Sequence, residues 1–218
     1  MISVDNITRR YGNLEVLKGI TLSIARGELV SIVGPSGAGK TTLLQIIGSL
    51  ERPDTGTVVY EGEGDIFKLN DARLARFRNR NVGFVFQFHQ LLPEFTLLEN
   101  VMMPALIGHT SRGAAEDRAK QLLDYLGLSH RLDHRPNQVS GGERQRAAVA
   151  RALINEPKVL LADEPSGSLD SSNRRELHSL FMQLNREMGQ TIVIVTHDDT
   201  FAADSHRIIT LEDGRVIE

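Results

Sequence analysis

Apolar and polar residues alternate along much of the first third of the chain, and short β-branched runs follow later. Alternation is typical of strands buried on one face, and apolar runs are typical of strands buried on both faces. Together they predict strands at residues 2–7, 20–24, 28–33, 57–60, 82–86, 159–162 and 191–195, with a last hairpin around Asp213-Gly214. The first part of the chain is therefore rich in β-structure.

Between these strands the apolar positions recur every three to four residues, which is the period of a helix with one buried face. The pattern predicts helices at residues 39–49, 72–80, 98–107, 114–126, 141–153 and 173–188. Three of them follow one another between Leu98 and Leu153 without a convincing strand. We therefore predict a single α/β unit over 1–218, with a core built from 1–87 and 157–218 and a helical lobe at 88–156.

Composition and charge narrow the class of protein. Of the 218 residues, 40% are hydrophobic and 24% are charged, as expected for a chain that buries a core of its own. The apolar runs are much shorter than the ~20 residues of a membrane-spanning helix, so a membrane role requires a partner chain. The N-terminus lacks a secretory signal and the chain lacks cysteine, which together indicate a cytoplasmic protein. A net charge of −3 argues against a nucleic-acid partner.

A glycine-rich motif after the strand at 28–33 predicts a phosphate-binding loop. It reads Gly34-Pro35-Ser36-Gly37-Ala38-Gly39-Lys40-Thr41 and fits the pattern G-x-x-x-x-G-K-[ST] between a strand and a helix. Glycine lets backbone N–H groups and the helix N-terminus surround the phosphate oxygens. Lys40 would then reach the β- and γ-phosphates, the Thr41 hydroxyl would bind Mg²⁺, and Thr42 joins the nucleotide-binding set. A lysine at this positive end of a helix dipole is unfavourable unless an anion binds there.

Two adjacent carboxylates, Asp163 and Glu164, follow the apolar strand at 159–162. In open α/β sheets, ligands bind at such carboxyl ends of strands. Asp163 is the candidate for holding Mg²⁺, and Glu164 is the candidate for polarising the attacking water. Adjacent side chains on a strand point to opposite faces, so the two acids have different roles unless the strand has already ended. Further along, Asp170 is either a helix cap or an interface contact.

The helix predicted at 141–153 begins with Ser140-Gly141-Gly142-Glu143. The spacing of Ser140 and Glu143 fits a capping box, in which each side chain bonds the backbone N–H of the other residue. A capping box does not require two glycines, and their bare backbone at a helix N-terminus is suited to phosphate. On these four residues alone, a cap and a second phosphate-binding half-site both stay open.

The longer string Val139-Ser140-Gly141-Gly142-Glu143-Arg144-Gln145-Arg146 resembles the signature motif of ABC ATPases. With the phosphate loop and the carboxylate pair, it makes the chain similar to that family over nearly its whole length. Further positions resemble family landmarks: Tyr11 the aromatic residue that stacks on adenine, Gln87 the glutamine that joins core and lobe, Ser168-Leu169-Asp170 the dimer-contact loop, and His197 the histidine that senses the γ-phosphate.

The resemblance implies the ABC-ATPase fold, which is a P-loop NTPase with a RecA-like core, an antiparallel β subdomain and an inserted helical subdomain. It implies an ATPase using ATP and Mg²⁺, with Glu164, His197 and Gln87 as catalytic residues and Thr41, Gln87 and Asp163 at the metal. It also implies a head-to-tail homodimer in which the signature helix of one chain caps the ATP on the phosphate loop of the other. Permease subunits in the membrane would be the partners, and the chain would lie peripherally on the cytoplasmic face of the inner membrane.

Within the family, residues 87–101 resemble the lipoprotein-releasing ATPases more closely than the macrolide-export or cell-division relatives, which are the alternative. The apolar residues Leu91, Leu92 and Leu98 either form a groove for a cytoplasmic helix of the permease or belong to the core of the lobe. A soluble DNA-repair ATPase is less favoured, because the chain has no heptad repeat and no cysteine for a zinc insertion.

Overall fold

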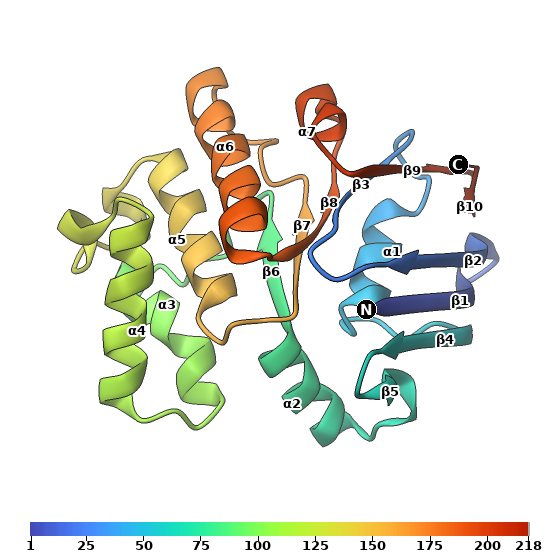
Figure 1. The fold of residues 1–218 in the computed structure, drawn as a ribbon, viewed down its shortest axis with the longest axis horizontal. Helices are drawn as coiled ribbons and strands as arrows, with labels where there is room; N and C mark the ends of the chain where they lie inside the picture. The colour runs from blue at the N-terminus through green and yellow to red at the C-terminus, as the bar shows by residue number, and fades with distance from the viewer. Residues whose placement is uncertain (218) are drawn as a thin grey trace.

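The computed structural model describes residues 1–217 and consists of two β-sheets beside a group of helices (Figure 1). The strands are β1 Ile2–Tyr11, β2 Leu14–Ile24, β3 Leu29–Val33, β4 Thr55–Tyr60, β5 Gly64–Asp65, β6 Val82–Phe86, β7 Val159–Asp163, β8 Thr191–Val195, β9 Arg207–Glu212 and β10 Arg215–Val216. The α-helices are α1 Lys40–Ile47, α2 Asp71–Asn81, α3 Leu97–Ile107, α4 Arg112–Tyr125, α5 Gly141–Leu153, α6 Ser171–Met188 and α7 Asp199–Ala203. Short 3₁₀ turns lie at Ile66–Lys68, Ser129–Arg131 and Pro136–Gln138.

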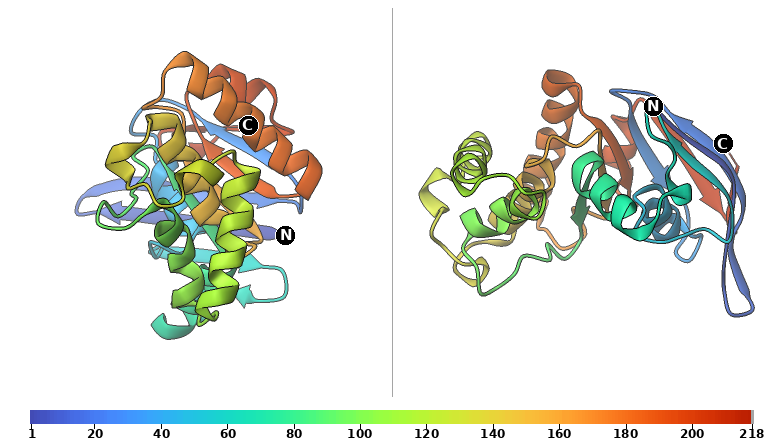
Figure 2. Two further views of the ribbon diagram at one scale, coloured as in Figure 1. Left: turned by 90° about the vertical axis from the view of Figure 1, so that its left-hand side faces the viewer. Right: turned by 90° about the horizontal axis from the view of Figure 1, so that it is seen from below.

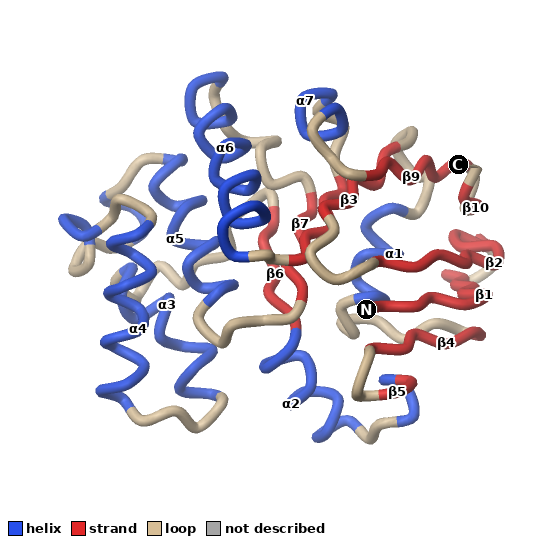
Figure 3. The backbone as a smooth tube through the Cα atoms, viewed as in Figure 1, coloured by secondary structure: helices blue, strands red, loops and turns tan. Residues whose placement is uncertain are grey.

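The strands form one mostly parallel sheet and one antiparallel sheet, which Figure 3 shows in red. The first has the order β10-β9-β3-β8-β7-β6, and all its neighbouring pairs are parallel except β10 with β9. Its central strands are apolar runs because both faces are covered, and every residue of β8 is buried. The antiparallel sheet has the order β2-β1-β4-β5 and carries the alternating pattern.

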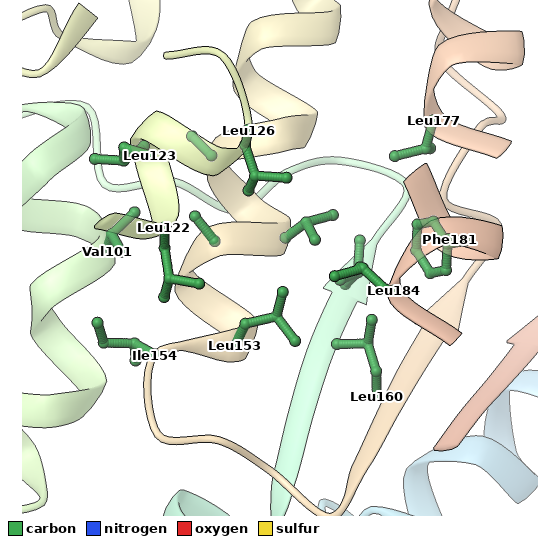
Figure 4. Close-up of a cluster of buried hydrophobic side chains, with 14 of the residues drawn as sticks. Val101, Leu122, Leu123, Leu126, Leu153, Ile154, Leu160, Leu177, Phe181 and Leu184 are labelled. Carbon is green, nitrogen blue, oxygen red and sulfur yellow. The ribbon is translucent and has the colours of Figure 1, made fainter. Parts of the chain in front are cut away.

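Two hydrophobic cores lie on the two faces of the mostly parallel sheet. One fills the space between the sheets around α1 and includes Leu43, Ile46 and Val193. The other joins the sheet to α6 and to the helices α3, α4 and α5. Figure 4 shows this second core, in which Leu160 of β7 and Phe181 of α6 lie in one cluster with the lobe residues. The helical lobe therefore shares its core with the sheet rather than closing on itself.

The lobe stands at one end of the molecule and the antiparallel sheet at the other, as Figure 2 also shows. This arrangement agrees with the predicted core, antiparallel sheet and inserted helices. The predicted strands at 82–86 and 191–195 have the bounds of β6 and β8, whereas β1 and β2 are longer than predicted and β5 and α7 were not predicted. No helix within residues 1–217 is long and apolar enough to cross a membrane.

Candidate functional site

The phosphate-loop motif lies between β3 and α1, and two of its glycines are required by the backbone. Gly34 has φ 142°, and a Cβ built there would lie 2.0 Å from the Leu211 carbonyl oxygen. Gly39 has φ 98°, and a Cβ there would lie 2.7 Å from Leu17 Cδ2. A side chain at either position would push the loop away from the strands that hold it. The motif is thus a tight turn whose tip, Pro35 to Gly37, is exposed.

Lys40 begins α1 and folds back over its own loop. Its Nζ donates hydrogen bonds to the carbonyl oxygens of Gly34 at 2.8 Å and Pro35 at 2.9 Å. No acidic residue lies in the first turn of α1. The positive end of the α1 dipole and the Lys40 ammonium therefore lie together, and no carboxylate of the first turn of α1 balances them. This arrangement favours an anionic ligand.

Thr41 and Asp163 meet at the carboxyl end of β7, as expected for a shared metal site. Thr41 Oγ1 donates to Asp163 Oδ1 at 3.1 Å. Burial raises the pKa of Asp163, while the Thr41 hydrogen bond and the nearby Lys40 oppose that rise. A bound cation would stabilise the ionised carboxylate. Hydroxyl, carboxylate and amide oxygens are the ligands that Mg²⁺ accepts, so these residues fit that ion.

A hollow of about 290 Å³ opens beside this pair, and we refer to it as the catalytic hollow. Its lining residues are Thr41, Gln45, Phe86, Gln87, Phe88, Gln90, Asp163 and Glu164. Four of the predicted site residues, Thr41, Gln87, Asp163 and Glu164, thus come together. Gln45 was not predicted, although it follows Thr41 by one helical turn and that spacing was available in the sequence.

Glu164 lies just beyond the end of β7, so the strand has ended before the second acid. Its φ of 45° is left-handed, an uncommon conformation for a residue with a side chain and one that recurs at functional sites. This turn places Glu164 in the same hollow as Asp163. His197 holds it there, because Nδ1 of His197 lies 2.8 Å from Glu164 Oε2 and the His197 backbone N–H donates to that oxygen at 3.4 Å.

Gln87 follows β6 and is held by the loop after β7. Ser168 Oγ donates to the Gln87 carbonyl oxygen at 2.9 Å. A Cβ added to Gly167 would lie 2.8 Å from Gln87 Nε2, so the glycine allows the two loops to pack closely. The Gln87 backbone is therefore held against the loop after β7, and its side chain packs against Gly167.

The capping box predicted at the start of α5 is present. The Ser140 N–H donates to Glu143 Oε2 at 2.7 Å, and the Glu143 N–H donates to Ser140 Oγ at 3.2 Å. Arg131 Nε donates to the other oxygen of Glu143 at 2.9 Å. These bonds, above all that from the Ser140 N–H, lower the pKa of Glu143 to about 2. Both carboxylate oxygens are thus engaged within the chain, and a direct role of Glu143 in nucleotide binding stays a prediction.

The two glycines of this motif have different surroundings. A Cβ added to Gly142 would lie 1.8 Å from Asn173 Oδ1, so Gly142 allows α5 and α6 to approach each other. A Cβ added to Gly141 would have its nearest neighbour at 3.7 Å, so the backbone there is open. An open helix N-terminus is suited to phosphate. Residues 140–143 do not line the catalytic hollow of their own chain.

Asp170 is a helix cap in this structure. Its Oδ1 accepts from the backbone N–H groups of Ser172 and Asn173, and its Oδ2 accepts from Asn173 Nδ2 at 2.8 Å. The Asn173 N–H is the main cause of a lowered pKa at Asp170. The cap is therefore observed, and an interface contact of Asp170 stays a prediction.

Tyr11 lies at the end of the β1–β2 hairpin, with its side chain partly exposed. Its hydroxyl donates to Glu51 Oε2, and the Arg9 guanidinium lies 4.9 Å from the centre of its ring. The same hairpin reaches the phosphate loop, because Val16 and Leu17 of β2 surround Gly39. Arg9 and Glu51 therefore hold the tyrosine ring in one orientation, with 44% of the residue still exposed.

A second groove, of about 420 Å³, lies at the boundary between core and lobe. We call it the lobe groove, and its lining includes Leu50, Phe84, Phe86, Pro104, Ile107 and Arg151. Ile107 is 65% exposed and Leu50 45% exposed, which is unusual for such large apolar side chains.

Leu91, Leu92 and Leu98 do not line this groove. Leu91 and Leu98 pack against the core of the lobe, as the second interpretation of these leucines expected. Leu92 is 39% exposed. The apolar groove therefore exists, but it is built from other residues than the leucines that suggested it.

Known proteins share both the sequence and the fold of this chain. A family model described as ABC transporter matches residues 17–167. The lipoprotein-releasing system ATP-binding protein LolD of Bacteroides fragilis is 58% identical over 217 residues, which cover 100% of both chains. The protein of the same name from Geobacter metallireducens is 52% identical over 221 residues, covering 100% of this chain and 98% of the relative.

Two solved structures extend the similarity to three dimensions. The dimeric structure of MJ0796, described as a bacterial ABC transporter cassette, has a TM-score of 0.91 at 42% identity and covers 100% of this chain and 97% of its own. A dimeric post-hydrolysis state of the same cassette, bound to ADP and Pi, has a TM-score of 0.90 at 41% identity with the same coverage.

Proposed function

Because this chain belongs to the ABC transporter family, we propose that it is the ATP-binding and ATP-hydrolysing subunit of a lipoprotein-releasing system. The observation that carries the proposal is the catalytic hollow, where Thr41 bonds Asp163 beside the phosphate loop and His197 holds Glu164. The full-length relatives named LolD support lipoproteins as the cargo.

The phosphate loop binds the phosphates of ATP. Backbone N–H groups of residues 36–42 surround the β- and γ-phosphates, and Lys40 exchanges its bonds to the Gly34 and Pro35 carbonyls for bonds to phosphate oxygens. Tyr11 stacks on the adenine ring with the face that Arg9 leaves free. Thr41, Asp163 and Gln87 would hold Mg²⁺, which when bound neutralises charge on the phosphates.

Glu164 acts on the water that attacks the γ-phosphate. Its carboxylate lies in the catalytic hollow and accepts the proton of the attacking water as the bond between the β- and γ-phosphates breaks. His197 keeps Glu164 in place through Nδ1 and its backbone N–H, and its exposed ring is free to contact the γ-phosphate. Glu164 and His197 then together position the attacking water, the proton that it loses and the γ-phosphate.

The second half-site implies a dimer. Gly141 is open for a ligand but lies outside the catalytic hollow of its own chain, so the nucleotide that it contacts belongs to another copy. A two-fold, head-to-tail dimer places Ser140 to Glu143 of each chain over the ATP of the other. The dimeric state of the similar cassette MJ0796 supports this arrangement.

The lobe groove receives a cytoplasmic helix of the permease subunits. Its exposed apolar residues, Leu50 and Ile107, lie beside the loop of Gln87, so a helix bound there is next to the catalytic hollow. The chain then sits peripherally on the cytoplasmic face of the inner membrane, anchored through its partners.

Lys40→Ala and Glu164→Gln test the ATPase assignment. We expect Lys40→Ala to abolish tight ATP binding in calorimetry, and Lys68→Ala, an exposed lysine, to leave it unchanged. We expect Glu164→Gln to keep ATP binding, to lose most hydrolysis and to accumulate as a dimer in gel filtration, whereas Glu212→Gln behaves as the parent. Normal turnover by Glu164→Gln, or normal affinity of Lys40→Ala, would contradict these assignments.

Affinity purification tests the transport assignment. A C-terminal tag on the native protein, mild detergent and mass spectrometry should recover permeases with large periplasmic domains together with a bound lipoprotein. Recovery of a macrolide-export or cell-division permease would place the chain in the alternative branch.

A further inference from the structure

The loop after β6 is fastened to α5 through its backbone carbonyl groups. Gln145 Nε2 donates to the Phe86 oxygen at 3.2 Å. Arg151 donates from Nη2 to the His89 oxygen at 2.9 Å and from Nη1 to the Gln90 oxygen at 2.6 Å. Phe86 is the last residue of β6, whereas His89 and Gln90 belong to no strand or helix, and side chains of α5 supply partners for all three carbonyls.

These contacts hold a loop that is locally strained. Gln90 has φ 49°, a left-handed conformation that costs energy for a residue with a side chain. The two bonds from Arg151 flank the strained residue, and Arg151 is itself desolvated, since burial lowers the pKa of its guanidinium. A strained loop conformation persists only when the surrounding contacts stabilise it, and the half-buried Arg151 supplies two of these contacts. The attachment of this loop to α5 is therefore a built feature rather than a chance surface contact.

His89 adds a contact in the opposite direction, from the loop to the first residue of α5. Its Nε2 lies 3.0 Å from the Gly141 carbonyl oxygen. A carbonyl only accepts, so the ring nitrogen donates. Burial lowers the pKa of His89 and the nearby Arg144 adds to this effect, while the bond to the Gly141 carbonyl opposes it. His89 thus joins the open glycine of the signature motif to the loop that carries Gln87.

We propose that His89 is a positioning residue that couples Gln87 in one nucleotide half-site to Gly141 in the other. Gln87 lies two residues before His89 in the same loop, so a displacement of Gln87 also moves the imidazole. Ser168 donates to the Gln87 carbonyl oxygen and so ties this loop to the loop after β7. The imidazole moves Gly141 through its hydrogen bond, while Gln145 and Arg151 stop the loop from sliding along α5. The inference rests on the proposed function, in which Gly141 contacts the ATP of the other copy.

The coupling predicts a selective effect of His89→Ala. The phosphate loop of the same chain is untouched, so ATP binding to the monomer should change less than twofold. The dimer that ATP induces should weaken, because Gly141 loses its support on both copies. In a Glu164→Gln background we expect half-maximal dimerisation to need about tenfold more ATP, the order expected for loss of one partly buried hydrogen bond.

The experiment compares four proteins by analytical ultracentrifugation at rising ATP: Glu164→Gln alone and the same protein with His89→Ala, His89→Asn or His109→Asn. A fluorescent ATP analogue reports monomer affinity at concentrations below dimerisation. Asparagine keeps an N–H donor, so His89→Asn should restore dimerisation to within about threefold of the parent. His109 is exposed and forms no hydrogen bond to α5 within residues 1–217, so His109→Asn should match the parent. Equal dimerisation by His89→Ala, or an equal loss of monomer affinity, overturns the proposal.

A second measurement separates this proposal from the proposed function. The chain has no cysteine, so Phe88→Cys, at a side chain that is 70% exposed, carries a single spin label next to His89. Without nucleotide, His89→Ala should make the label clearly more mobile in its electron paramagnetic resonance spectrum. An unchanged spectrum refutes the His89–Gly141 link whatever the dimer assay gives. A Glu164→Gln parent that never dimerises with ATP contradicts the proposed function instead.

Discussion

Glu143 provides a direct measure of how firmly the start of α5 is held. Its carboxylate accepts from the Ser140 N–H at 2.7 Å and from Arg131 at 2.9 Å. Hydrogen bonds to a charged group contribute about 1.5–3 kcal/mol each. Glutamine at this position still closes a capping box but loses the charge, so we expect Glu143→Gln to lower the free energy of unfolding by about 1–2 kcal/mol. Glu143→Ala loses both bonds, and we expect about 2–4 kcal/mol.

The pH dependence of this effect follows from the pKa of Glu143, which is lowered to about 2 in the folded protein. A group whose pKa is lower in the folded state stabilises it above the ordinary pKa of 4.5, and this contribution is lost as the pH falls toward about 2. The difference between the parent and Glu143→Gln should therefore be full at pH 7 and clearly smaller at pH 3.5.

Thermal unfolding followed by circular dichroism measures both effects. For a chain of this size, 1–2 kcal/mol corresponds to a decrease in Tm of about 2–8 °C. Glu99→Gln is the matched control, because Glu99 forms a second capping box with Thr96. Within residues 1–217 no arginine donates to the Glu99 carboxylate, so this box lacks the additional bond that Glu143 has. It should lose less than Glu143→Gln. An absent difference at pH 7, or one that widens on acidification, would show that the charge of Glu143 does not stabilise this end of α5.

Three further substitutions test the packing around the site. Gly34→Ala should lower the free energy of unfolding by more than about 3 kcal/mol or prevent folding, because its Cβ would meet the Leu211 carbonyl. Gly37→Ala, at φ 81° with no atom within 4 Å of the added Cβ, should lower it by about 1–2 kcal/mol. Equal Tm values for the two variants would contradict the argument. Asn100→Ala should lower the free energy of unfolding by about 2–4 kcal/mol and speed limited proteolysis between residues 91 and 96, because the buried Asn100 amide bonds Leu92, Phe95 and Thr96. Asn81→Ala loses one such bond and should lower it by about 1 kcal/mol. Tyr60→Phe removes a buried hydroxyl that donates to the Ile47 carbonyl at 2.9 Å and should cost about 1 kcal/mol in urea unfolding, with no loss at all as the contrary result.

The elements that the sequence predicted best are those whose pattern is strongest. β6 and β8 are apolar runs with clear ends, and α5 has both a cap and a long apolar period, so their predicted bounds agree with the structure. The outer parts of β1 and β2 carry polar residues such as Arg9 and Arg10, whose sequence pattern is typical of a loop. In the structure, the turn at Gly12-Asn13 brings the two strands together, so these residues pair as strand. Helix α7 is too short to show a period, although Asp198 caps it and offered a local signal.

The phosphate-loop and strand-end motifs predicted Thr41, Asp163 and Glu164 as site residues, and these three line the catalytic hollow. Gln87 was predicted from the family resemblance, whereas Gln45 was not predicted. The left-handed backbone of Glu164 was not predictable, since glutamate has no preference for it and the contacts of Val195 and His197 impose it. The bond between His89 and Gly141 joins positions that lie 52 residues apart, and no local pattern reveals such a pair.

The two interpretations of Ser140-Gly141-Gly142-Glu143, a helix cap and a phosphate half-site, turn out to be complementary. A helix leaves the N–H groups of its first turn without partners inside the helix. The capping box uses the Ser140 and Glu143 side chains on two N–H groups, those of Ser140 and Glu143 themselves, and leaves the N–H groups of Gly141 and Gly142 outside the box. The serine and the glutamate therefore fix the helix end, while the glycines leave it open for the phosphate of the other copy in the proposed dimer. A substitution at Glu143 should change the stability of this half-site before it changes its chemistry.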